Sequence, residues 1–349
     1  MALTRPLRLK SEVAKLRPEA SSSILPVARV WVDSGVFHLD QHFDYLVPDN
    51  LSPLVKTGIR IQVPFHGREV EALVIARIAQ SDSPVLKSIT KVLSPHSVAT
   101  TESLSLIEAA AHRWAAHPYD ILRSAIPPRI ASVDKESFQD SDASSRTGKA
   151  KRSYVQIPPV VNRFEFIESM VSNSSIRGSV LIVLPDSRSA THLHSLVKSS
   201  ILLDSTLERA ERYRNFLQIR NGRDLIVIGT RSAIFAPIAD LSSIIVIDEG
   251  SESHYEPRTP GWNVRDVAIL RSRQSNLSLN FVGYSPSSEA ARLIETKWMD
   301  SIKPNNFQTE GNSFQYQQVF DTGFIQNACI LDALFAMGGK QALTMISSF

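Results

Sequence analysis

Residues 224–249, DLIVIGTRSAIFAPIADLSSIIVIDE, form the stretch that decides the fold of this chain. Two runs of branched apolar residues, 225–228 and 244–247, each end in polar residues and are separated by a loop that contains Pro237. Short continuous runs of this kind, bounded by turn residues, are typical of strands that are buried on both faces of a parallel sheet. The stretch therefore predicts two strands of a parallel α/β sheet.

Polar residues follow each predicted strand at its carboxyl end, which is the edge where open α/β sheets bind ligands. Gly229, Thr230 and Arg231 follow the first strand, and Asp248 and Glu249 follow the second. A carboxylate in this position often only caps the next helix. The functional alternative is the edge of a helicase-type sheet that hydrolyses nucleotides, where the Asp holds Mg²⁺ and the Glu orients water. The dipeptide alone leaves both interpretations open.

The order of motifs from about residue 211 to 271 resembles the helicase core of the PriA family, bacterial proteins that restart replication. The successive motifs are ERYRNFLQIRNGRD, IVIGTRSAIFAP, IVIDE, SHYEPR and VRDVAILRSR, of which GTRSAIFAP is the most specific. The resemblance implies that Thr230, Arg231 and Ser232 contact the DNA backbone, and the alternative for Arg231 is an internal ion pair. It also implies that Asp248 and Glu249 occupy a degenerate nucleotide and magnesium site.

Residues 26–93 contain five short alternating segments, VARVWVDSG, HFDYLVP, IRIQVPF, EVEALVIARIA and LKSITKVL, with turn residues between them. This pattern predicts a small, twisted antiparallel sheet or half-barrel. The segments also resemble the N-terminal domain of the PriA family, which recognises the 3′-hydroxyl end of a DNA strand. The resemblance implies a pocket for the terminal nucleotide that is formed by Phe43, Asp44, Tyr45, Gly67 and Lys87.

The chemistry of these five residues suits a DNA end. An aromatic face can stack on the last base, a carboxylate can accept a hydrogen bond from the free hydroxyl, and a lysine can meet a phosphate. One departure from the family pattern lies in the turn, where His66 stands between the V-P-F motif and the glycine. The structural alternative is that Phe43 and Tyr45 are core aromatics of a hairpin and that Asp44 is its turn residue.

The remaining segments predict the domain boundaries. Residues 1–25 form a basic arm, 26–130 the DNA-end domain, 131–153 a polar linker, 154–297 a degenerate RecA-like helicase lobe and 298–349 an unassigned tail. The first domain is expected to close with a helix over 101–116 capped by Thr101, followed by a second helix that begins at Pro118. The predicted fold class is therefore multidomain α/β, with a β-rich first domain and a parallel α/β lobe.

Motifs that an ATPase of this architecture needs are missing. No glycine or lysine occurs from residue 155 to 177, where a phosphate-binding loop is expected. The family box D-E-x-H appears as DEGS, its S-A-T-P segment as GYSPS, and only about 50 residues follow Lys297 in place of a second lobe. Cys329 is the single cysteine, so the paired cysteines that bind zinc in the family have no counterpart. We expect no ATP, magnesium or zinc cofactor, as in the actinobacterial branch with decayed ATPase motifs, and a truncated reading frame would explain the missing lobe.

Composition limits the function classes further. The chain has 349 residues, 43% of them hydrophobic and 21% charged, and a formal net charge of +3. No apolar run approaches the roughly 20 residues that span a bilayer, so the sequence predicts a cytoplasmic protein with no membrane partner. The leading hypothesis is a DNA-binding replication-restart protein without helicase activity, whose partners are forked DNA with a 3′ end, primosomal proteins, the replicative helicase and single-strand-binding protein. The alternatives are an active ATP-dependent 3′–5′ helicase in a longer reading frame, and a truncated pseudogene product.

Overall fold

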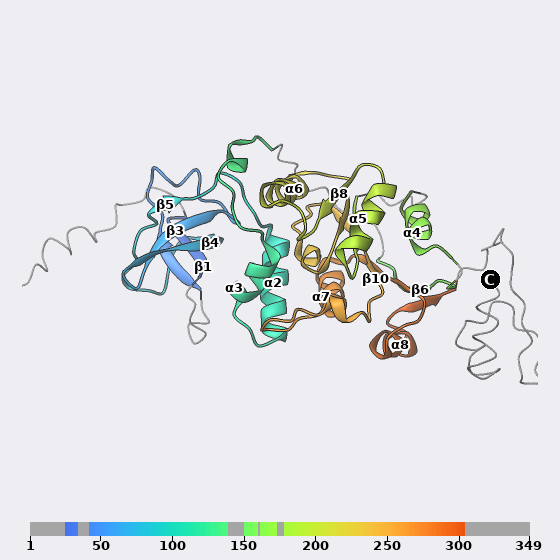
Figure 1. The fold of residues 1–349 in the computed structure, drawn as a ribbon. Helices are drawn as coiled ribbons and strands as arrows, with labels where there is room; N and C mark the ends of the chain where they lie inside the picture. The colour runs from blue at the N-terminus through green and yellow to red at the C-terminus, as the bar shows by residue number, and fades with distance from the viewer. Residues whose placement is uncertain (1–24, 34–41, 139–149, 160, 173–177, 304–349) are drawn as a thin grey trace, which may run out of the picture. The chain divides into compact units, whose positions relative to one another are not determined.

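The computed structural model describes residues 25–33, 42–138, 150–159, 161–172 and 178–303 (Figure 1). The chain divides into two compact units, one made of Met1–Arg152 with Ser175–Asn280 and the other of Ser153–Ser174 with Phe281–Phe349. The predicted basic arm up to residue 24 and the predicted tail from residue 304 lie outside the described residues.

The first unit begins with a five-stranded antiparallel sheet in the order β2-β1-β4-β3-β5 (Figure 1). Its strands are β1 (Val27–Val32), β2 (Phe43–Leu46), β3 (Arg60–Phe65), β4 (Arg68–Ile78) and β5 (Lys91–Val92). Branched apolar residues such as Val30, Ile61 and Val74 are fully buried in one cluster on this sheet. The antiparallel sheet predicted from the alternating segments is confirmed, and its two edge strands are β2 and β5.

A two-residue turn joins β3 and β4. Phe65 pairs with Arg68 across the hairpin, so His66 and Gly67 alone form the loop. Both have positive φ angles, 45° and 77°, as a type I′ turn requires. Glycine adopts this conformation freely, whereas histidine is one of the few other residues that does so at modest cost. The histidine inserted before Gly67 is thus accommodated as the first residue of the turn.

Two helices follow the sheet. Helix α2 (Thr101–Arg113) is capped by Thr100, not by Thr101 as expected, because the Thr100 hydroxyl accepts from the Ser103 amide while the Ser103 hydroxyl accepts from the Thr100 amide. Helix α3 (Pro118–Ala125) begins at Pro118 as predicted. It ends at Ala125, since Ile126 is already extended before Pro127.

The same unit holds a parallel sheet built from β8 (Ser200–Leu203), β9 (Ile226–Gly229), β7 (Ser179–Val183) and β10 (Leu241–Ile247). Strand β7 pairs with β9 on one side and with β10 on the other, both in parallel, and β9 pairs with β8. The two strands predicted from residues 224–249 therefore end at one edge of the sheet, with β7 between them. The parallel α/β prediction is confirmed, whereas β8 was not predicted because residues 192–200 were assigned to a helix.

Helices α5 (Ser187–Leu196), α6 (Arg209–Asn221) and α7 (Val264–Ser275) and two short 3₁₀ helices, η2 (Arg231–Phe235) and η3 (Glu252–His254), complete this part of the unit. Gly229, at the end of β9, allows a close approach between strands. A Cβ atom there would lie 2.5 Å from both the Leu203 carbonyl oxygen and the Ala233 Cβ. Only glycine fits this position without a shift of the backbone.

The second unit contains the greater part of β6 (Arg152–Gln156), the end of β11 (Ser278–Gly283), α4 (Arg163–Ser172), α8 (Ser288–Glu295) and β12 (Asp300–Ile302). Strand β12 pairs with β6 in parallel. The Ile157 amide donates to the Gly283 carbonyl at 3.0 Å, beside the end of β11.

The segment predicted as a polar linker contains a short 3₁₀ helix, η1 (Val133–Lys135), whose Val133 is fully buried. The Asp134 carboxylate accepts hydrogen bonds from Ser94, at 2.9 Å, and from Tyr213 of α6, at 3.0 Å. Arg129 donates to the second carboxylate oxygen at 2.5 Å. This part of the segment is thus a polar junction within the first unit.

Candidate nucleic-acid interface

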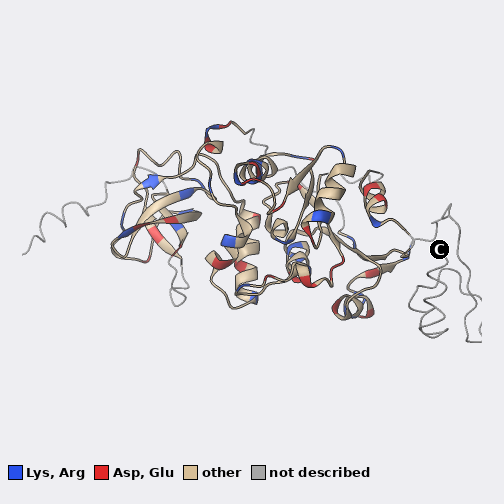
Figure 2. Ribbon diagram, viewed as in Figure 1, with Lys and Arg blue, Asp and Glu red and all other residues tan. Residues whose placement is uncertain are grey.

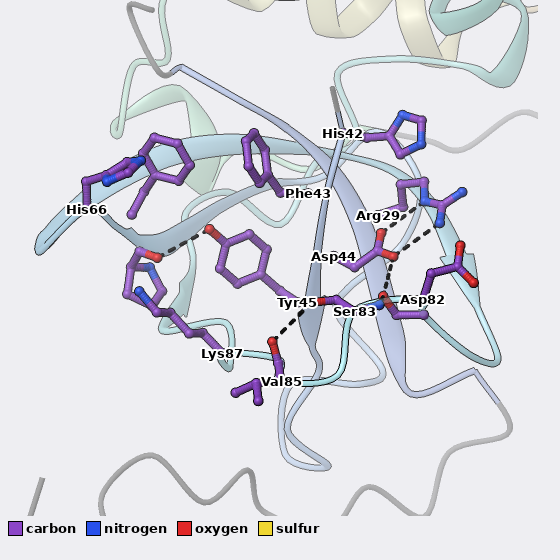
Figure 3. Close-up of a pocket in the computed structure, with 13 residues that line it drawn as sticks. Arg29, His42, Phe43, Asp44, Tyr45, His66, Asp82, Ser83, Val85 and Lys87 are labelled. Carbon is purple, nitrogen blue, oxygen red and sulfur yellow. Dashed lines mark hydrogen bonds and ion pairs between the residues drawn. The ribbon is translucent and has the colours of Figure 1, made fainter. Parts of the chain in front are cut away.

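An open pocket of about 610 Å³ lies at the edge strand of the antiparallel sheet (Figure 3). Its volume is within the range of roughly 300–1,000 Å³ that is usual for small-molecule sites. Four of the five predicted DNA-end residues line it, namely Phe43, Asp44, Tyr45 and Lys87. Gly67 does not line the pocket, but its neighbour in the turn, His66, does. Because β2 is an edge strand, side chains from both of its faces can reach the same opening.

Three rings form one wall of this pocket. The Phe43 and Phe65 rings are 5.0 Å apart at 78°, and the Phe65 and His66 rings are 4.6 Å apart at 87°. Edge-to-face pairs of this kind leave ring faces available to a planar ligand. Both phenylalanines are partly buried and pack against the core of the sheet. The wall is therefore a supported surface on which a nucleic-acid base can stack.

Tyr45 belongs to the core of the sheet and also lines the pocket. Its side chain belongs to the buried core, as the structural alternative expected, and its hydroxyl donates to the Pro64 carbonyl at 3.2 Å. Burial, with a smaller contribution from Glu69, raises the pKa of Tyr45 to about 12. The ring therefore stays neutral at physiological pH and supports the turn that carries His66.

Asp44 lies within β2, directly opposite Arg29 of β1, and is not a turn residue. Arg29 Nε donates to Asp44 Oδ1 at 2.9 Å and Arg29 Nη2 to Oδ2 at 3.1 Å, while Ser81 Oγ donates to Oδ2 at 2.7 Å. Burial raises the pKa of Asp44, but the hydrogen bonds from Arg29 and Ser81 and the charge of Arg29 outweigh it and hold this pKa below its usual value. The hydrogen bond to Asp44 correspondingly raises the pKa of Arg29.

These three hydrogen bonds leave Asp44 with unused capacity. A carboxylate offers roughly four lone-pair positions, and three are filled. The remaining position is on Oδ1, which among the described residues accepts one hydrogen bond, from Arg29. An additional hydroxyl donor can therefore be bound by a carboxylate that is already ionised and held in place.

The loop after β4 completes the pocket with Ser81, Asp82, Ser83, Val85 and Lys87. The Leu46 amide of β2 donates to the Lys87 carbonyl at 2.8 Å, which ties the end of this loop to the edge strand. Figure 3 shows the Lys87 side chain on the side of Tyr45 away from Asp44, so the pocket has a basic end and an end with the Arg29–Asp44 pair.

Sequence reasoning missed Arg29, Ser81 and Val85, which is 76% exposed at the pocket. A strand register would have indicated Arg29, because it faces Asp44 across an antiparallel pair. No local pattern indicates Ser81 or Val85, since their loop positions depend on contacts made over long range.

The predicted backbone-contact residues lie at the carboxyl edge of the parallel sheet. Arg231 Nε forms an ion pair with Glu256 at 3.2 Å, and Arg231 Nη1 donates to the Ser253 and Tyr255 carbonyls at 3.2 and 2.8 Å. Thr230 Oγ1 donates to Asp204 at 2.8 Å. A contact of Thr230, Arg231 and Ser232 with DNA remains a prediction. All three side chains have partners within the protein, since Ser232 Oγ accepts from Arg212 Nη2 at 3.4 Å.

Asp248 and Glu249 follow β10. Glu249 is 1% exposed and its Oε2 lies 3.9 Å from Arg265 Nη1, while Asp248 has a φ angle of 49°. In the other unit, the segment after β6 contains Pro158 and Pro159, which offer no amide donor to a phosphate. Through residue 177 the sequence after β6 offers a triphosphate neither a glycine-rich loop nor its lysine, and the absence of nucleotide binding remains a prediction.

The described residues contain neither a metal-ligand cluster nor a helix that could span a membrane. No group of three or more His, Cys, Asp or Glu side chains in these ranges is arranged to hold a metal ion. No helix within them is long and apolar enough to span a bilayer.

Comparison with known proteins places the pocket in a defined domain. Residues 29–127 match the family model described as the 3′ DNA-binding domain of PriA, and this range includes every pocket residue. The chain is 31% identical over 322 residues to the probable replication restart protein PriA of Mycobacterium tuberculosis CDC 1551, covering 83% of this chain and 49% of that protein. It is 28% identical to the Mycobacterium leprae protein and 22% identical to the Rickettsia conorii protein of corresponding names, covering 84% and 78% of this chain and 50% and 44% of those proteins.

Solved structures with similar chains include RecG bound to a three-way DNA junction, with 12% identity and a TM-score of 0.34 over 84% of this chain and 54% of that chain. A DEAD box protein from Methanococcus jannaschii has 13% identity and a TM-score of 0.28 over 59% of this chain and 53% of that chain.

The chain therefore has a 3′ DNA-binding domain, formed by the antiparallel sheet with its pocket, followed by a parallel α/β sheet. Over most of its length the chain is a relative of the PriA replication restart proteins, and the resemblance stated from the sequence is confirmed. The chain spans about half the length of the curated relatives that it matches.

Proposed function

We propose that this chain is a DNA-binding replication-restart protein that recognises the 3′-hydroxyl end of a DNA strand at a stalled fork in the cytoplasm. The observation that carries the proposal is the Asp44 carboxylate, which is fixed by Arg29 and Ser81 and retains one acceptor position on Oδ1. A terminal hydroxyl can donate to that oxygen. An internal nucleotide has no free hydroxyl there, so the contact selects for strand ends.

The other pocket residues provide affinity in this proposal. The terminal base stacks on the wall that Phe43 and Phe65 begin, a contact worth about 1–3 kcal/mol per base. The ammonium group of Lys87 meets the phosphate that precedes the terminal nucleotide. A base, a hydroxyl and a phosphate would thus each have a matching group in one pocket.

The proposal gives this chain no role in ATP hydrolysis, and it is supported by the poor fit of the segment after β6 to a triphosphate. Primosomal proteins, the replicative helicase and single-strand-binding protein are the proposed protein partners. These partners come from the resemblance to the PriA family, and no described surface identifies them.

The test is a comparison of two forked DNAs that differ only in whether the strand that ends at the junction presents a 3′-hydroxyl or a 5′ end. We expect the intact chain to bind the fork with the 3′-hydroxyl about tenfold more tightly, and Phe43→Ala and Lys87→Gln to weaken this complex. Equal affinity for the two forks would contradict the proposal.

A further inference from the structure

Helix α6 carries several arginines, visible in Figure 2. Two of them, Arg212 and Arg220, have a buried Nε atom without a hydrogen-bond partner among the described residues, and Arg220 has other interactions. Arg212 is partly buried, and its Nε atom is enclosed without any hydrogen-bond partner. Its single hydrogen bond is a long one from Nη2 to Ser232 Oγ at 3.4 Å. Within the part of the chain that the structure describes, Arg212 forms no ion pair. Burial lowers its pKa, and Asp204 offsets this only in part.

The nearby carboxylate of Asp204 is already satisfied. Asp204 Oδ1 accepts from the Thr206 amide and hydroxyl at 2.8 and 2.6 Å. Asp204 Oδ2 accepts from Ser187 at 3.0 Å and from Thr230 at 2.8 Å. These bonds fill the roughly four lone-pair positions of a carboxylate, so Asp204 offers Arg212 no direct hydrogen bond.

Other arginines of this region have carboxylate partners. Arg231 pairs with Glu256 at 3.2 Å, and Arg214, two residues further along α6, donates to both oxygens of Glu136 at 2.7–3.1 Å. A partly enclosed guanidinium without a hydrogen-bonded carboxylate is unfavourable, because it has lost water contacts and the charge of Asp204 compensates it only in part. Arg212 is therefore prepared to accept an anion from outside the chain.

We propose that Arg212, together with the hydroxyl of Ser232, contacts a phosphate of the DNA backbone beside the carboxyl end of β9. A guanidinium presents a planar set of donors that matches two oxygens of a phosphate, and the Ser232 hydroxyl can donate to a third. The contact would lie beside Arg231, whose guanidinium pairs with Glu256 and whose own DNA contact remains a prediction. The inference rests on the proposed function, because DNA is taken as the source of the phosphate rather than a free nucleotide or inorganic phosphate.

The experiment measures the affinity of the intact chain for single-stranded DNA over a range of salt concentrations. Arg212→Gln is expected to weaken binding roughly tenfold at about 0.1 M salt and to lower the slope of log affinity against log salt by about one unit. Arg214→Gln, on the same helix, removes the same charge from an internal pair and is expected to leave the slope unchanged. Arg212→Met separates a binding role from a structural one, because removal of an uncompensated cation should keep or raise the thermal midpoint while DNA affinity still falls.

Each outcome decides the proposal. The Arg212 contact is refuted if Arg212→Gln keeps the affinity and salt slope of the unmodified chain, or if Arg214→Gln lowers the salt slope equally. Either result refutes the contact even when the unmodified chain prefers 3′-hydroxyl ends. If that preference is absent but Arg212→Gln still lowers the slope, the contact holds and end recognition fails. Displacement of DNA by millimolar inorganic phosphate or ATP that disappears in Arg212→Gln would identify a free phosphate site and overturn DNA as the ligand.

Discussion

Replacement of Arg29 by glutamine tests the arrangement of the pocket, because this side chain holds both oxygens of Asp44. Hydrogen bonds to charged groups contribute about 1.5–3 kcal/mol each, but the Arg29 side chain is 29% exposed and water replaces part of that contribution. We therefore expect Arg29→Gln to lower the free energy of unfolding by about 2 kcal/mol at pH 7. The same change should weaken the preference for 3′-hydroxyl ends, since Asp44 loses its fixed orientation.

The assay is urea denaturation of the unmodified chain, Arg29→Gln, Asp44→Asn and the double variant, which together give the coupling energy of the pair. The pKa of Asp44 is depressed below 3.8 in the folded protein, so the contribution of the pair is present above about pH 4 and is lost as pH falls through the folded pKa. The difference between Arg29→Gln and the unmodified chain should therefore shrink in acid. A coupling energy under about 0.5 kcal/mol, or a difference that is the same at pH 7 and in acid, would refute this reasoning.

Two further predictions concern the polar junction at Asp134 and the parallel sheet of the first unit. Tyr213→Phe should lower the free energy of unfolding by about 1 kcal/mol in thermal or urea denaturation, because Asp134 loses one buried hydrogen bond; an unchanged midpoint would contradict this. Gly229→Ala should destabilise the chain by about 1–3 kcal/mol in the same assay, since its Cβ would lie 2.5 Å from two atoms; a cost near zero would show that β8 and β9 can move apart.

The sequence predicted the fold best where it contains continuous runs of apolar residues. The runs that became β7, β9 and β10 are continuous and branched, and the parallel sheet follows from them. Strand β8 was missed because SILL follows HLHSLVKS without a proline or glycine, so the end of α5 at Leu196 has no local marker. The N-cap of α2 also has no local marker, because Thr100 and Thr101 are adjacent and both residues can cap a helix. Only the hydrogen bond that the Ser103 amide donates to the Thr100 hydroxyl identifies Thr100 as the cap.

In the pocket, sequence motifs indicated residues of the edge strand and the basic loop, but not their partners. Asp44 was singled out by its motif, whereas Arg29 and Ser81 come from positions 15 and 37 residues away. Partners at such separations depend on strand register and loop path, which local patterns do not encode. For Arg231 the motif gave a residue type suited to DNA, but the pair with Glu256 forms through a loop that the sequence leaves undefined.

The most direct test of end recognition is the affinity of the intact chain for one oligonucleotide that ends in either a 3′-hydroxyl or a 3′-phosphate. The hydroxyl can donate to Asp44 Oδ1, whereas the phosphate brings a second anion to that carboxylate. An unpaired buried acceptor costs about 1–3 kcal/mol, so we predict tenfold or tighter binding of the hydroxyl end, and loss of this preference in Asp44→Ala with salt-sensitive binding retained. Equal affinity for both ends, or tighter binding of the phosphate through Arg29 and Lys87, would contradict the assignment of Asp44 as the group that recognises the 3′ end.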